Sequence, residues 1–116
     1  MKNIRLIASD IDGTLLLNGS QAIDPEIFNL IHQLQQKDIL FMAASGREYT
    51  NLRDLFSPVA DDIAYLCLNG CITFYKGECI SKEVMDAELA RKLITTIQND
   101  SDAEVLVSGE KTCYIM

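Results

Sequence analysis

Basic residues are scarce in this chain of 116 residues, which has 10 Lys and Arg against 17 Asp and Glu and a formal net charge of −7. Such a chain is repelled by the phosphate backbone of nucleic acids and by anionic membranes. Long apolar runs are also missing, because the run from Ile4 to Ala8 is broken by Arg5 and falls far short of the ~20 residues of a membrane span. We therefore expect no nucleic-acid partner and no membrane partner. An anionic substrate would need a metal cation or a local basic group.

The four cysteines and the single histidine do not form a zinc motif. Cys67, Cys71, Cys79 and Cys113 have spacings unlike those of common zinc sites, and His32 is distant from them in the sequence. Without an export signal, the thiols are expected to be reduced in a cytoplasmic protein, where free cysteines behave as small buried hydrophobes. The Walker lysine loop and the G-x-G-x-x-G motif are absent as well. The usual nucleotide motifs therefore do not apply.

Strand and helix patterns alternate from the first residues. Apolar runs predict buried strands at residues 4–9, 39–44 and 63–68. One helix is predicted from Asp24-Pro25, with Ile27, Leu30, Ile31 and Leu34 on its buried face, and a second with Tyr49, Leu52, Leu55 and Phe56 inward. A β-hairpin is predicted around Lys76-Gly77. Two strand–helix–strand units predict an α/β fold with a doubly wound, Rossmann-like parallel sheet.

The pattern changes after Ser81. A third helix is predicted from Asp86, with Leu89, Ala90, Leu93, Ile94 and Ile97 facing inward. Two strands are predicted at residues 104–107 and 112–116. We expect this segment to form a unit separate from the first three strands.

Polar residues follow each of the three predicted strands, where ligands bind in an open parallel sheet. Asp10 and Asp12 follow the first, Ser45-Gly46-Arg47 the second and Asn69-Gly70 the third. Two carboxylates favour a hard cation such as Mg²⁺, and Ser45 with the Gly46 N–H offers donors to phosphoryl oxygens. Each segment is also compatible with an ordinary turn. Together they indicate phosphoryl transfer.

These residues also resemble the motifs of a known family. The segment from Ser9 to Leu15, SDIDGTL, is similar to the first motif of the haloacid dehalogenase-like (HAD) hydrolases. Ala44-Ser45-Gly46-Arg47 and Leu68-Asn69-Gly70 resemble the Cof-type phosphatase branch of that superfamily. The resemblance runs from about Ile4 to Ile80. It implies the N-terminal part of a HAD-like core domain at residues 1–81 and the beginning of a truncated α/β cap at residues 82–116.

The resemblance implies a role for each matching residue. Asp10 would be the nucleophile that forms an aspartyl-phosphate, and Asp12 the general acid and base. Both would hold Mg²⁺, Asp12 through its main-chain carbonyl. Ser45 and the Gly46 N–H would bind the phosphoryl group of a small phosphorylated metabolite, such as a sugar phosphate. Arg47 and Asn69 would lie at the substrate entrance.

Two features of the family are not found up to Met116: a lysine that balances charge at the nucleophile, and an acidic pair that completes the Mg²⁺ shell. The chain alone is therefore expected to turn over poorly or not at all. The first strand would also lack a neighbour on one side, which favours a homodimer or a swapped oligomer. Two other functions stay open, a non-catalytic module that binds phosphate or sugar phosphate and a receiver-like signalling domain. Against the latter, Asn69 stands where a receiver domain needs an aspartate.

Overall fold

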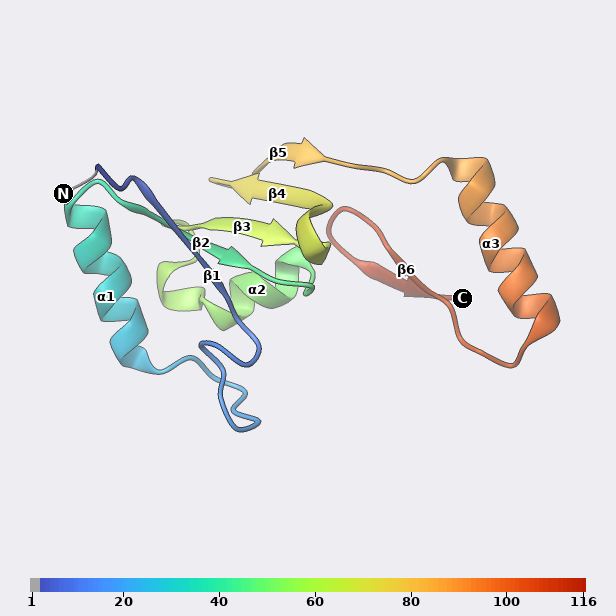
Figure 1. The fold of residues 1–116 in the computed structure, drawn as a ribbon, viewed down its shortest axis with the longest axis horizontal. Helices are drawn as coiled ribbons and strands as arrows, with labels where there is room; N and C mark the ends of the chain where they lie inside the picture. The colour runs from blue at the N-terminus through green and yellow to red at the C-terminus, as the bar shows by residue number, and fades with distance from the viewer. Residues whose placement is uncertain (1–2) are drawn as a thin grey trace.

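The computed structural model describes residues 3–116, which form a five-stranded mixed sheet followed by a helix and a two-stranded sheet (Figure 1). The strands of the larger sheet are β1 (Leu6–Asp10), β2 (Leu40–Ala44), β3 (Ala64–Cys67), β4 (Ile72–Tyr75) and β5 (Glu78–Lys82), in that order across the sheet. The first three strands run parallel, whereas β4 is antiparallel to β3 and to β5. The α/β fold with a mostly parallel sheet, predicted from the sequence, is confirmed.

Two helices pack on the same face of this sheet: α1 (Pro25–Gln36) and α2 (Tyr49–Leu55). Phe56 follows α2 and precedes the short 3₁₀-helix η1 (Ser57–Val59). It is fully buried, and its ring centroid lies 6.2 Å from that of Phe28 in α1 and 5.9 Å from that of Phe41 in β2. Tyr49 of α2 stacks on Phe74 of β4 at 3.9 Å. These aromatic contacts join both helices to one continuous core.

Helix α1 begins where the sequence predicts it. The Asp24 carboxylate accepts a hydrogen bond of 2.9 Å from the N–H of Glu26, and Pro25 occupies the first turn. Its buried face differs in one position from the predicted stripe, because Leu30 is exposed while Phe28 packs on the core. The contact with Phe56 fixes the rotation of the helix and selects Phe28.

Strand β1 lies at the edge of the five-stranded sheet, with β2 as its neighbour (Figure 1). Leu6 and Ile7 point to opposite faces of the sheet and are 48% and 37% exposed, so neither face of β1 is covered. A complete doubly wound sheet has helices on both faces. Within residues 3–116, α1 and α2 cover one face, so the sheet is partial, as the sequence led us to expect.

The predicted hairpin is present between β4 and β5. Lys76 and Gly77 both have positive φ angles, 51° and 77°. Two such residues between antiparallel strands form the turn whose twist matches that of the strands. This hairpin adds two antiparallel strands beyond β3 and buries Phe74 in the core.

The segment after β5 contains α3 (Ala87–Asp100), β6 (Leu106–Ser108) and β7 (Cys113–Ile115). Asp86 caps α3 through a 3.0 Å bond from the N–H of Leu89. The predicted buried face of this helix is wrong in part, because Leu89, Leu93 and Ile97 are exposed and Ala90 and Ile94 are half-buried. No strand of the described residues covers α3 enough to bury the whole stripe. The division after Ser81 stays a prediction, since β5 continues to Lys82.

Candidate active site

The carboxyl ends of β1 and β2 bring two of the predicted motifs together. Asp10, the last residue of β1, is the register partner of Ala44, the last residue of β2. Ser45 therefore follows directly beside Asp10, at the same edge of the sheet. This is the edge at which open parallel sheets bind ligands.

A tight turn places both aspartates at the surface. The carbonyl of the fully buried Ile11 accepts bonds from the N–H groups of Thr14, Leu15 and Leu16, at 3.1, 2.9 and 3.0 Å. Gly13 has a φ of 82°, which an L side chain rarely adopts, so a glycine is favoured at this position. The Thr14 hydroxyl donates to Oδ2 of Asp10 at 3.3 Å. The turn anchors its apolar residue in the core and holds Asp10 and Asp12 outward.

Three backbone hydrogen bonds join the segment after β2 to the end of β3. Ser45 donates to the Leu66 carbonyl at 2.9 Å, and Leu68 and Asn69 donate to the carbonyls of Arg47 and Ser45, both at 3.1 Å. The buried Ser45 hydroxyl accepts a 3.0 Å bond from the N–H of Arg47. Its own O–H therefore stays available to donate to a ligand oxygen.

Arg47 connects the second motif to the first. Its Nε and Nη2 donate to the two carboxylate oxygens of Asp12 at 2.9 and 2.7 Å. This bidentate geometry is the strong form of an arginine–carboxylate pair. The Arg47 hydrogen bond is the main reason that the pKa of Asp12 lies below its usual value, and the same bond raises the pKa of Arg47. The family resemblance implied a place for Arg47 at the substrate entrance, and the Arg47–Asp12 ion pair was not predicted.

The third predicted motif lies against the second. Asn69 and Leu68 of the 3₁₀-turn η2 (Leu68–Gly70) have positive φ angles of 57° and 50°, as does Gly70 at 96°. The Asn69 carboxamide rests on Gly46, where a Cβ atom would lie 2.9 Å from its Oδ1. All six predicted site residues, Asp10, Asp12, Ser45, Gly46, Arg47 and Asn69, are therefore at one end of the sheet.

The oxygen donors at this end suit Mg²⁺ better than a softer metal. Asp10 offers a carboxylate and Asp12 a second carboxylate and a main-chain carbonyl. No group of three or more His, Cys, Asp or Glu side chains that could hold a metal occurs among residues 3–116. Mg²⁺ is commonly held by one or two protein carboxylates together with substrate phosphate and water. The residues present fit part of such a shell.

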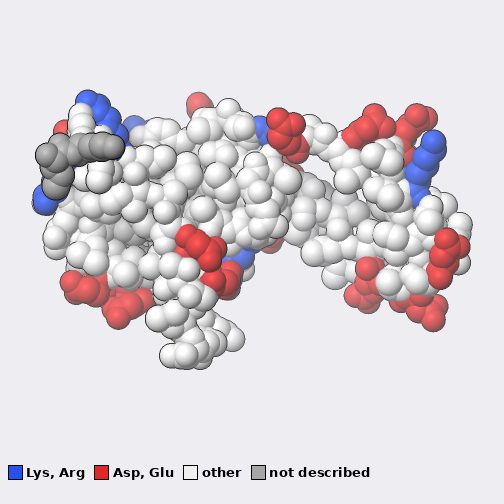
Figure 2. Space-filling view, viewed as in Figure 1, with Lys and Arg blue, Asp and Glu red and all other residues white. Residues whose placement is uncertain are grey.

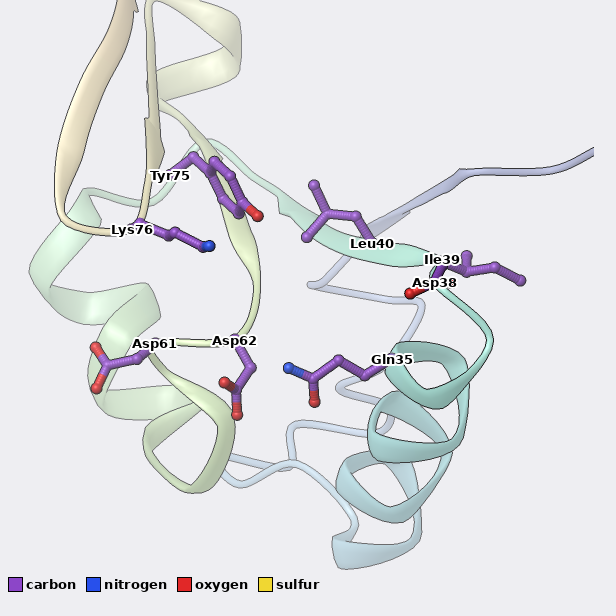
Figure 3. Close-up of a pocket in the computed structure, with 8 residues that line it drawn as sticks. All are labelled: Gln35, Asp38, Ile39, Leu40, Asp61, Asp62, Tyr75 and Lys76. Carbon is purple, nitrogen blue, oxygen red and sulfur yellow. The ribbon is translucent and has the colours of Figure 1, made fainter.

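A separate cavity of about 380 Å³ lies at the opposite end of the sheet (Figure 3). Its lining includes Asp38, Asp61, Asp62, Gln35 and Lys76, which come from the segments that lead into β2 and β3 and from the β4–β5 turn. Gln35 and Asp62 extend toward the same space in the view, and Arg53 forms an ion pair with Asp61 at 2.9 Å. Asp61 and Asp62 therefore lie away from Asp10 and Asp12.

The charge pattern on the surface follows the composition. Figure 2 shows groups of acidic side chains on the visible face, with basic side chains at fewer positions. No helix of residues 3–116 has both the length and the apolar character that crossing a bilayer requires. At the site, Arg47 is the basic residue that the structure places beside the aspartates.

Comparison with known proteins identifies the family. The family model of the haloacid dehalogenase-like hydrolases matches residues 7–116. The chain belongs to this family. The match includes the three segments that resemble HAD and Cof-type motifs, and it extends through the segment after Ser81.

Similar proteins include two phosphatases. The chain is 27% identical to the 5-amino-6-(5-phospho-D-ribitylamino)uracil phosphatase YbjI of Escherichia coli, over 98% of this chain and 42% of that protein. It is 33% identical to a phosphoglycolate phosphatase of Sulfolobus acidocaldarius, over 83% of this chain and 41% of that protein. A crystal structure of a protein from Eubacterium rectale matches with a TM-score of 0.83 and 31% identity, over 95% of this chain and 42% of that one. The chain thus spans about two fifths of each of these HAD relatives.

Sequence reasoning missed two side chains at the site. Thr14 is part of the first motif, but its hydrogen bond to Asp10 was not predicted. Asn51 was not predicted to belong to the site, although its Oδ1 accepts a 2.7 Å hydrogen bond from Nη1 of Arg47. Arg47 precedes Glu48, the N-cap of α2, so the i, i+4 rule for two residues within a helix does not relate it to Asn51. No pattern in the sequence signalled this contact.

Proposed function

We propose that this chain is the nucleophile-bearing part of a Mg²⁺-dependent phosphatase that acts on phosphate monoesters of small metabolites. The observation that carries the proposal is the meeting of two strand ends. Asp10 ends β1 beside Ser45, and Asp12 is joined to Arg47. A nucleophile, an acid–base group and donors for phosphoryl oxygens are then within one site.

The reaction would take place in two steps. A carboxylate oxygen of Asp10 attacks phosphorus, the bond to the ester oxygen breaks, and Asp12 gives its proton to the leaving alcohol. Water then attacks the phosphorus of the aspartyl-phosphate while Asp12 accepts a proton, and the bond to Asp10 breaks to release phosphate. Arg47 favours the carboxylate form of Asp12, which is the form that the second step requires and not the protonated form that the first step uses.

The remaining donors support the same chemistry. The O–H of Ser45, whose oxygen accepts from the N–H of Arg47, and the N–H of Gly46 would bind phosphoryl oxygens. Thr14 holds one oxygen of Asp10 through its hydroxyl, which leaves the other for attack. Asp10 and Asp12 would hold Mg²⁺, which when bound neutralises the charge between the carboxylate and the phosphoryl group.

The substrate class follows from what similar proteins share. A ribitylamino-uracil phosphate and phosphoglycolate are the substrates named for two of the relatives, and they differ in everything except the phosphate monoester. We therefore assign this chain to small phosphorylated metabolites, with sugar phosphates as the first compounds to test.

Hydrolysis of a panel of phosphate monoesters, with and without Mg²⁺, tests the proposal. We expect slow Mg²⁺-dependent phosphate release from the unaltered chain, and none from Asp10→Asn. Asp102→Asn is the matched control, because Asp102 is exposed and remote in sequence from the site. Equal activity in the chain and in Asp10→Asn would refute the nucleophile assignment. Saturable phosphate binding without turnover in any condition would instead favour the non-catalytic alternative.

The free edge of β1 supports a second proposal, that the chain associates with another copy of itself. Both faces of β1 are exposed, and its outer edge has no neighbouring strand among residues 3–116. Such an edge pairs readily with another strand. Sedimentation velocity should detect a dimer or swapped oligomer whose population falls when Ile7 is replaced by Lys. A monomer at all concentrations would contradict this proposal.

A further inference from the structure

The guanidinium of Arg47 is held on two sides. Nε and Nη2 donate to Asp12, while Nη1 donates to Oδ1 of Asn51 at 2.7 Å. Three of the five N–H donors that every arginine carries are thus engaged by two residues from different elements. Asp12 comes from the turn after β1 and Asn51 from α2.

Asn51 is the more firmly anchored of the two partners. The residue after it, Leu52, is fully buried, and Tyr49 in the same helix stacks on Phe74 of β4. The helix therefore cannot turn without disrupting the core. The Asp12 side chain, by contrast, is 57% exposed and belongs to a turn.

The anchoring of Asn51 matters because an exposed ion pair alone does little to fix the orientation of its two side chains. Pairs of this kind are screened by water and must overcome the rotamer freedom of both side chains. A third hydrogen bond to an acceptor on a helix anchored in the core limits the rotation of the guanidinium and restricts its plane. Because the arginine fork is planar, setting its plane also sets where a bidentate carboxylate can lie.

The hydrogen bond between Arg47 and Asn51 lies near a second carboxylate, that of Asp54. Gln21, Arg47, Asn51, Asp54 and Leu55 line a cavity of about 420 Å³ beside the site. Asp54 is thus a second carboxylate on the same cavity wall as Arg47, whose hydrogen bonds go to Asp12 and Asn51. Asn51 keeps Arg47 directed toward Asp12.

We propose that Asn51 is a positioning residue that acts through Arg47 to hold the Asp12 carboxylate in its place at the site. The effect on catalysis rests on the proposed function, whereas the effect on Arg47 and Asp12 does not. The hydrogen bond of Asn51 goes to Arg47 and not to Asp10 or Ser45, so Asn51 is not assigned a catalytic role.

Two variants of nearly equal shape separate the acceptor from the bulk of the side chain. Asn51→Leu removes the acceptor oxygen, and Asn51→Asp retains it. Thr50→Ala is the control on the same helix, since Thr50 is exposed and bonds to Glu48 rather than to Arg47. Because Asn51 is itself exposed, the core is not disturbed, and Asn51→Ala repeats the test should the leucine variant misfold.

The first readout is the NMR spectrum of the Arg47 side chain. Its signals are assigned as those that disappear in Arg47→Lys. In the unaltered chain we expect separate Nη signals and a slowly exchanging Nε–H. Asn51→Leu should merge the Nη signals and shift the carboxyl carbon of Asp12, whereas Asn51→Asp and Thr50→Ala should not. Unchanged Arg47 and Asp12 signals in Asn51→Leu would overturn the proposal.

The second readout is phosphomonoester hydrolysis. Asn51→Leu should lower kcat about tenfold, as expected from the loss of a charge-assisted hydrogen bond, with little change in KM. Asn51→Asp should restore most of kcat. If the unaltered chain hydrolyses nothing, the NMR signals still decide the positioning role, and phosphorylation of Asp10 decides the proposed function.

Discussion

The carboxamide of Asn69 lies on the backbone of Gly46, although α2 and β3 separate the two residues in the chain. A Cβ atom on residue 46 would be 2.9 Å from Oδ1 and 3.4 Å from Nδ2 of Asn69. Gly46 does not have a positive φ, so its small size, rather than its backbone freedom, is what this contact requires. The absence of a side chain lets the ends of β2 and β3 approach each other at the site.

Gly46→Ala should weaken phosphate binding and spare the fold. The added methyl group displaces the Asn69 carboxamide, which is exposed and free to shift. We expect the affinity for inorganic phosphate, measured by calorimetry with Mg²⁺, to fall about fivefold, the effect of one hydrogen bond of ~1 kcal/mol. Gly77→Ala is the contrasting control: it has open space but a φ of 77°, so it should lower stability and leave phosphate affinity unchanged.

Replacement of Arg47 by Gln should make stability less dependent on pH in acid. Arg47 lowers the pKa of Asp12 from its usual 3.8, so the pair stabilises the folded state above that pH and ceases to do so as the pH falls through the lowered pKa. The stability difference should be under about 1 kcal/mol at neutral pH, because the pair is partly exposed, and should vanish in strong acid. Urea unfolding across the acid range measures it. A difference that persists unchanged in acid would contradict the assignment.

Phe56→Ala should destabilise the chain severely. Phe56 is fully buried and contacts Phe28 and Phe41, so its loss removes the junction between α1 and β2. The expected cost is about 3–5 kcal/mol in the free energy of unfolding, measured by urea denaturation. Tyr114→Ala, at an exposed position of β7, should change it by less than about 0.5 kcal/mol. Similar losses in both variants would show that the aromatic core is not where stability lies.

The cysteines should differ strongly in reactivity. Burial raises the pKa of the Cys67 thiol to about 11, so little thiolate forms there at neutral pH. Cys71 is exposed. In the folded chain a thiol-specific disulfide reagent should label Cys71 rapidly and Cys67 only after unfolding. Comparing Cys71→Ser with the unaltered chain assigns the fast phase, and a fast phase that survives this substitution would contradict the prediction.

The sequence predicted the location of the site better than its internal contacts. Apolar runs that end in Asp10, Ser45 and Asn69 identify strand ends, and parallel pairing then brings those ends to one edge. The Asp12–Arg47 pair spans 35 residues, and no local pattern encodes it. The direction of the Arg47 side chain depends on where α2 begins and on the acceptor that Asn51 provides.

For the helices too, the sequence predicted the element better than its contacts. The spacing of apolar residues predicted α1, but it could not choose between Leu30 and Phe28, which lie on adjoining parts of the helix surface. Packing against Phe56 made that choice. For α3, the apolar stripe predicted a helix correctly, whereas the burial of the stripe depends on what packs against it, and Leu89, Leu93 and Ile97 stay exposed.

Formation of an aspartyl-phosphate at Asp10 tests the central claim most directly, and a single phosphoryl transfer does not require repeated turnover. The unaltered chain would be mixed with Mg²⁺ and p-nitrophenyl phosphate, quenched in acid, digested and examined by mass spectrometry. We predict one added phosphoryl group on the peptide that carries Asp10, and none in Asp10→Asn. No phosphorylated peptide in the unaltered chain, or a phosphoryl group on another residue, would contradict the account.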